Sequence, residues 1–150
     1  MIIRKMLPEE LELVGLLMQY YRDEAGIADD DYNEEKALQS IKSYAINWNL
    51  FLRVAYEGTR PVGIIGGFLT ESPVTNEVAT GIQFLYLLEQ YSSTTNYMQL
   101  LAPFEEWSRE VKATSIKFLG IGKTPSQIVN ILNDLEFDRL GQQILAKEIV

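Results

Sequence analysis

The spacing of apolar residues over the first 50 positions predicts one strand followed by two helices. An apolar-polar alternation over residues 2–6 is typical of a strand. Pro8 suits a first helical turn, and apolar residues then recur every three or four positions up to Gly26. Asn33 can cap a second helix with the same spacing. The predicted apolar faces are Leu11, Val14, Leu17, Met18 and Tyr21 on the first helix, and Ala37, Ile41, Tyr44, Ala45 and Trp48 on the second.

The period then changes to that of strands. Residues 50–56 and 61–69 form two such runs, joined by the turn-rich link Glu57-Gly58-Thr59-Arg60, which predicts an antiparallel hairpin. Gly63, Gly66 and Gly67 lie inside the second run. Because glycine weakens a strand interior, three of them indicate a bulge, tight packing, or a backbone that something else approaches closely.

The second half of the chain centres on a strand-loop-helix unit over residues 84–107. A long strand over 78–88 leads through a polar link into a helix over 96–112, which Pro103 should kink. A strand over 115–121, a short helix over 125–135 and a last strand over 142–149 follow. Strands alternating with helices require a parallel pair, whereas hairpins require antiparallel ones. We therefore expect an α+β fold, a mixed sheet of about six to seven strands flanked by about four helices.

Composition narrows the function. The 150 residues suit one domain, expected to span 1–150, and a net charge of -8 disfavours nucleic acids and anionic membranes as partners. The chain has no Cys, which removes disulfides, thiolate nucleophiles and cysteine metal sites, and no His, so the usual neutral-pH acid-base group is missing. The run Asp29-Asp30-Asp31 lacks the glycine and later Glu of a calcium loop, so a solvated loop is favoured and no metal site is predicted. With no signal peptide or membrane span in view, a cytoplasmic protein is the expectation.

The junction between the long strand and the next helix is the place where an anion can bind. A helix N-terminus offers unpaired backbone N–H groups and the positive end of the helix dipole. The polar link from Ser92 to Asn96 lies at this point of the chain.

The element order, together with VGIIGGFLT at 62–70, LYLLEQY at 85–91 and LLAPFEEW at 100–107, resembles the GNAT superfamily of acyl-CoA-dependent N-acetyltransferases. The resemblance covers nearly the whole chain and is closest to the small versions encoded by bacteriophages. It implies the GNAT fold and a site for acetyl-CoA beside the fourth strand.

In that family the loop after the fourth strand reads Arg/Gln-x-x-Gly-x-Gly/Ala, and its backbone N–H groups bind the coenzyme A pyrophosphate. This chain places Ser92 at the first position, Thr95 at the first glycine and Tyr97 at the second. The loop is therefore degenerate, and binding is weakened rather than excluded, since hydroxyls can still meet a phosphate. The alternative is that this link only caps the helix, with Thr94 or Thr95 as the N-cap. The candidate cofactor-binding residues are Leu87, Leu88, Ser92, Ser93, Thr94, Thr95 and Asn96.

The catalytic positions implied by the resemblance also differ. Where the family has a Tyr that protonates the leaving thiolate, this chain has Leu132; Pro125 replaces an Asn and Glu136 a glycine, although Phe137 matches. On the fourth strand, Gln83 cannot accept a proton and Tyr86 is expected to be a core or edge aromatic. No catalytic residue is assigned.

Two hypotheses follow. In the first, the chain is a degenerate GNAT-fold protein without a cofactor that acts through a protein partner, as a phage component, in phage assembly or on a host protein. In the second, it is an active N-acetyltransferase that uses acetyl-CoA, and its acidic surface attracts a cationic amine. A homo-oligomer is left open in both.

Overall fold

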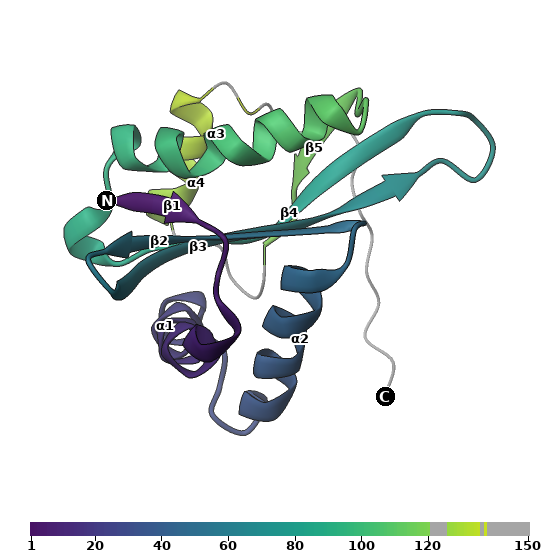
Figure 1. The fold of residues 1–150 in the computed structure, drawn as a ribbon. Coiled ribbons are helices and arrows are strands. Elements are labelled where there is room, and N and C mark those ends of the chain that lie inside the picture. Colours follow the sequence, from purple (N-terminus) through teal and green to yellow (C-terminus); the bar gives the residue numbers. More distant parts are fainter. Residues whose placement is uncertain (121–125, 136, 138–150) are drawn as a thin grey trace.

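The computed structural model describes residues 1–120, 126–135 and 137. In Figure 1, α1 and α2 lie on one face of a twisted sheet and α3 lies on the other. Along the chain the elements are β1 (Ile2–Arg4), the 3-10 helix η1 (Pro8–Glu10), α1 (Leu11–Ala25), α2 (Glu34–Ile46), β2 (Leu50–Glu57), β3 (Arg60–Glu71), β4 (Val78–Leu87), the 3-10 helix η2 (Glu89–Tyr91), α3 (Thr94–Glu110), β5 (Ser115–Phe118) and α4 (Ser126–Asp134). None of the helices in the described part of the chain has the length and apolarity needed to cross a bilayer.

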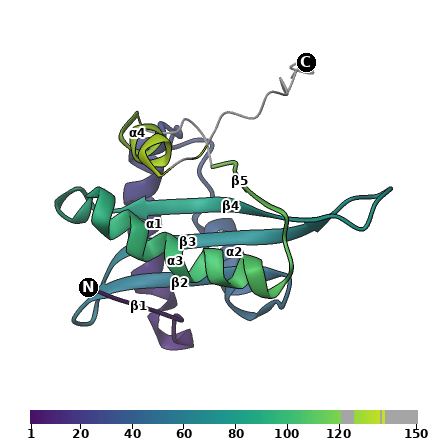
Figure 2. The ribbon, with the colours of Figure 1, turned by 90° about the horizontal axis from the view of Figure 1, so that it is seen from above.

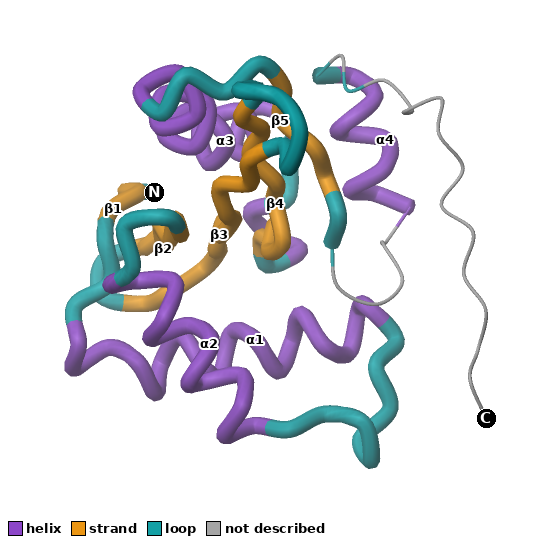
Figure 3. Tube along the Cα trace, turned by 90° about the vertical axis from the view of Figure 1, so that its right-hand side faces the viewer, coloured by secondary structure: helices purple, strands orange, loops and turns teal. Residues whose placement is uncertain are grey.

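The sheet is mixed, as predicted. Its order is β1-β2-β3-β4-β5, and all neighbours are antiparallel except β4 and β5, which are parallel. Within the described ranges the sheet has five strands rather than six to seven. The strand predicted over 142–149 lies outside the described residues. Figure 2 shows α3 crossing the face of the sheet, and Figure 3 shows α1 and α2 together on the opposite side.

The glycines of β3 permit a bulge and close packing, two of the predicted outcomes. Register shifts at Gly66/Gly67, where β4 has one additional residue, Gln83, between the partners Phe84 and Ile82. A Cβ on Gly67 would lie 2.2 Å from the carbonyl oxygen of Gly81 and 2.5 Å from the Phe104 ring. The sheet and α3 therefore approach each other too closely at this point for any side chain at position 67.

Most helix boundaries follow from local chemistry. Asn33 caps α2 as predicted, accepting a hydrogen bond from the Lys36 N–H at 2.9 Å. The cap of α3 was predicted wrongly: it is Ser93, whose hydroxyl accepts from the Asn96 N–H, so the helix begins at Thr94. Trp48 does not lie on a buried face, because α2 ends at Ile46 and the indole is 78% exposed.

The pairing of β4 with β5 is short. It runs only from Ala79–Ser115 to Ile82–Phe118, and Gln83 then donates a hydrogen bond to the Gly120 carbonyl. The rest of β4, from Phe84 to Leu87, has no strand partner on that side within the described residues. This unpaired edge of β4 is where a ligand site was expected.

Candidate functional site

The unpaired edge of β4 carries backbone donors. The Leu88 N–H donates to the Val62 carbonyl of β3 at 2.9 Å. Because successive residues of a strand direct their N–H groups to opposite edges, the N–H of Leu87 points away from β3, toward the β5 side. This N–H group therefore lies at the unpaired edge of β4, where the resemblance implies a site for acetyl-CoA.

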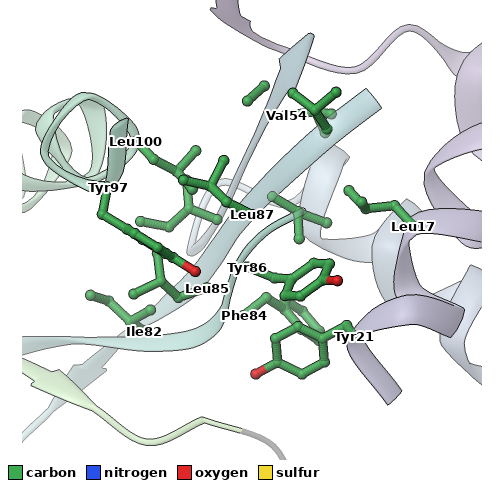
Figure 4. Packing of buried hydrophobic residues seen from close by; sticks show 14 of the residues in the cluster. Leu17, Tyr21, Val54, Ile82, Phe84, Leu85, Tyr86, Leu87, Tyr97 and Leu100 are labelled. Atoms are coloured by element: carbon green, nitrogen blue, oxygen red, sulfur yellow. The ribbon is translucent and has the colours of Figure 1, made fainter. Parts of the chain in front are cut away.

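Tyr97 is buried beside this edge of β4. It comes from the first turn of α3, is 2% exposed, and lies against the side chains of Leu85, Leu87 and Leu100 (Figure 4). Burial raises the pKa of its phenol, while the Ser92 side chain and the Leu87 backbone beside it act to lower that pKa. A backbone group that lowers a phenol pKa does so as a donor, so the phenol oxygen faces the Leu87 N–H. The phenol is neutral at neutral pH.

Three backbone donors at the start of α3 are bonded within the protein. The N–H of Ser92 donates to the Glu89 carbonyl at 3.0 Å, that of Asn96 to the Ser93 hydroxyl at 3.2 Å, and that of Tyr97 to the Ser93 carbonyl at 2.9 Å. The Asn96 amide also donates to the Tyr91 carbonyl at 2.8 Å. These bonds cap the start of α3 at the place where the resemblance implies a cradle for phosphates.

The predicted cofactor-binding residues lie in two different environments. Leu87 and Leu88 are buried in the core, whereas Ser93, Thr94 and Thr95 are exposed at the start of α3. The Ser92 hydroxyl is buried and has no hydrogen-bond partner of normal geometry among the described residues, although it is close enough to influence the Tyr97 phenol. Of this set, Leu87 and Ser92 lie beside the Tyr97 phenol.

The late helix provides no proton donor at the expected place. Leu132 is 6% exposed and belongs to the hydrophobic core. Pro125 and Glu136 lie outside the described residues. The Phe137 N–H donates to the Leu132 carbonyl at 2.9 Å, which closes the end of this helix.

A second feature borders β4 on its opposite face. It is a cavity of about 570 Å³ between α1, the link from α1 to α2, and α2. Tyr44 and Phe84 form an edge-to-face pair in its wall, with ring centroids 5.0 Å apart. Its lining includes Met18, Tyr21, Asp31, Lys36, Tyr44 and Phe84. The sequence placed Tyr21 and Tyr44 on apolar helix faces correctly, but gave no sign of the space between them.

Sequence reasoning also missed a carboxylate beside β4. The Tyr86 hydroxyl donates to Glu24 of α1 at 3.2 Å, and its ring meets that of Tyr21 at 5.3 Å. Burial raises the pKa of the Tyr86 phenol, and the Glu24 carboxylate raises it further. Tyr86 is a core aromatic, as predicted. The spacing of three between Tyr21 and Glu24, which places both on one helix face, was the available signal.

Several solved structures have a similar architecture. A predicted acetyltransferase from Clostridium acetobutylicum, solved with acetyl-CoA, matches with a TM-score of 0.82 and 11% identity over 97% of this chain and 95% of that one. An aminoglycoside N-acetyltransferase, AAC(6')-Iy, solved with CoA, matches with a TM-score of 0.77 and 13% identity over 98% and 93%. A GNAT family acetyltransferase from Staphylococcus aureus matches with a TM-score of 0.69 and 17% identity over 99% and 98%. The chain has the fold of the GNAT N-acetyltransferases.

These identities show the fold alone. No protein-family model and no curated protein matches the chain. Two of these structures were solved with CoA or acetyl-CoA, and the corresponding place in this chain is the unpaired edge of β4. The edge at Leu87 does not fit such a molecule in the observed arrangement, because the buried Tyr97 ring lies there. Of the donors at the start of α3, the N–H groups of Ser92, Asn96 and Tyr97 are already bonded.

Proposed function

We propose that this protein has lost efficient acetyl-CoA chemistry and that it acts by binding a partner. The observation that carries the proposal is the buried side chain of Tyr97 at the edge of β4. A GNAT-type reaction relies on holding thioester and amine together, an effect of roughly 7–11 kcal/mol, whereas one acid or base contributes about a hundred- to ten-thousandfold. The Tyr97 ring at the edge of β4 should therefore lower the rate of acetyl transfer more than the absence of a proton donor at Leu132 does.

The partner that we propose is a protein. A role in a phage particle, in its assembly or on a host protein follows only from the sequence resemblance and stays a prediction. Calorimetric titration with acetyl-CoA tests the first half of the proposal. The wild-type protein should give no binding in the micromolar range, and a micromolar dissociation constant would contradict the proposal.

Two variants separate the effect of the ring from other causes. Tyr97→Gly removes the ring and restores the residue type of the family loop, so acetyl-CoA binding should increase relative to wild type. Tyr97→Phe keeps the ring at the edge of β4 and should bind no better than wild type. Circular dichroism of both variants establishes that each is folded before titration.

One observation favours the second hypothesis, an active N-acetyltransferase acting on a cationic amine with acetyl-CoA. The Glu24 carboxylate lies beside β4 and accepts a hydrogen bond from Tyr86, which makes it a candidate base. If the wild-type protein acetylates an amine and Glu24→Gln abolishes the activity while Glu12→Gln does not, this second function replaces the first.

A further inference from the structure

The cavity between α1 and α2 carries opposite charges that are not used within the protein. Of the charged side chains in its lining, Arg22 is already neutralised: it binds Asp23 at 2.9 Å and Asp29 at 3.1 Å. Asp31 and Lys36 also line the cavity, and the described residues supply neither with an ion-pair partner. They do not pair with each other either.

The cavity wall between these charges is apolar and aromatic. Met18 and Phe84 are buried, and Tyr44 packs edge-to-face on Phe84. An interior of this kind favours an apolar or aromatic group, because removing such a group from water is worth roughly 1.5–3 kcal/mol. A volume of about 570 Å³ is within the range of small-molecule sites.

A ligand that satisfies the whole cavity needs a negative group for Lys36, a positive group for Asp31 and an apolar body. We propose that the cavity binds a small zwitterion with an apolar or aromatic side chain, the chemistry of a free α-amino acid. A simple amine would leave Lys36 unpaired, and a simple carboxylate would leave Asp31 unpaired. The inference rests on the proposed function in one respect: the ligand is bound and released unchanged.

Ligand analogues test each part of this recognition. L-phenylalanine, L-leucine and L-methionine are titrated by calorimetry and by saturation-transfer NMR. L-phenylalaninamide, which lacks the carboxylate, and 3-phenylpropionate, which lacks the ammonium group, should each bind roughly two- to fivefold more weakly than L-phenylalanine, since both ion pairs are at an exposed rim. L-alanine, which lacks the apolar body, should bind about tenfold more weakly.

Protein variants then link each charge to one ligand group. Lys36→Met should weaken L-phenylalanine but leave L-phenylalaninamide unchanged, and Asp31→Asn should weaken L-phenylalanine but leave 3-phenylpropionate unchanged. Lys42→Met, on the same helix, and Asp30→Asn, next to Asp31, do not line the cavity and should have no effect.

Two results would overturn the inference. One is that none of the three amino acids binds more tightly than L-alanine. The other is that L-phenylalanine and its two singly charged analogues bind equally. The proposed function fails separately: if an amino acid binds and is acetylated when acetyl-CoA is added, the ligand class stands and the non-catalytic role does not.

Discussion

The two faces of β4 differ in how the neighbouring helices cover them. On the face under α3, Leu85, Leu87 and Tyr97 are packed together in the core (Figure 4). On the face toward α1 and α2, Phe84 lies in the wall of a cavity of about 570 Å³. Within the described residues, the cavity beside β4 lies on this second side.

The filled side follows from one residue. Side chains of a helix point toward its N-terminus, so a large residue in the first turn of α3 lies back over the end of β4. A glycine at position 97 would leave this space open, whereas a tyrosine fills it. On the opposite side, aromatic rings of the helices pack edge-to-face on rings of β4, Tyr44 on Phe84 and Tyr21 on Tyr86. A cavity remains near the link between α1 and α2.

The largest expected effect on the free energy of unfolding comes from removing the buried Tyr97 ring. Tyr97→Ala should lower the free energy of unfolding by about 3–5 kcal/mol, because it empties a buried aromatic site. Tyr44→Ala, at the half-buried wall of the open cavity, should cost clearly less. Urea unfolding of both variants measures the difference. Equal losses would mean that the two sides of β4 are packed alike.

Glycine substitutions compare the packing of α3 on the sheet with the packing of α1 on α2. Gly67→Ala places a Cβ 2.2 Å from the Gly81 carbonyl oxygen and 2.5 Å from the Phe104 ring, and should cost about 1–3 kcal/mol. Gly15→Ala, on α1, meets only the end of the Leu38 side chain at 2.6 Å. Its gain in helix propensity, about 1 kcal/mol, should offset that contact. Thermal unfolding of the pair measures this, and a larger loss for Gly15→Ala would contradict the comparison.

Removing one hydroxyl group on each side of β4 should give a smaller difference in the free energy of unfolding. Thr80 and Ser108 share a buried hydrogen bond of 2.7 Å between β4 and α3. Ser108→Ala leaves the Thr80 hydroxyl without this partner and should cost about 1–2 kcal/mol. Tyr86→Phe frees only the exposed Glu24 carboxylate, which water can hydrate, so its cost should be smaller. Chemical denaturation of both variants tests the order, which would be reversed if the α3 side were less tightly packed.

The smallest effect is a pH dependence at the start of α1. Hydrogen bonds from the Arg4 guanidinium lower the pKa of Glu10 from 4.5 to about 2, with support from the Leu7 N–H and the Tyr56 hydroxyl. Because the folded-state pKa is the lower one, the stabilisation is present above pH 4.5 and is lost as the pH falls toward about 2.

The variant Glu10→Gln should therefore show a smaller loss of stability than wild type over that acidic window. Urea midpoints measured from neutral pH down to about 2 provide the test. Glu9→Gln, which neutralises the adjacent carboxylate, is the matched control and should follow wild type. Parallel curves for wild type and Glu10→Gln would show that Glu10 does not contribute.

Much of the architecture was predictable from local patterns. The order of strands and helices, the hairpin at Gly58 and the Asn33 cap all depend on residues close together in the chain. The bulge at Gly66 and Gly67 also needs β4, whose Gln83 is the additional residue. Errors arose where a local pattern continued past its element. Trp48 has the right spacing for the α2 face, but the helix has ended before it. Ser93 was not predicted as the cap because four hydroxyl residues, Ser92 to Thr95, follow one another directly.

The candidate site was predictable only as a location. The sequence alone established that Tyr97 stands at a glycine position of the GNAT-like loop and that Tyr21 and Tyr44 face inward. The tertiary structure decided that Tyr97 reaches the Leu87 backbone, that Glu24 meets Tyr86, and that α1 and α2 leave a cavity with unpaired charges. The physical reason is that periodicity sets the face on which a side chain lies. Whether the space in front of it is filled depends on helices and strands brought together from distant parts of the chain.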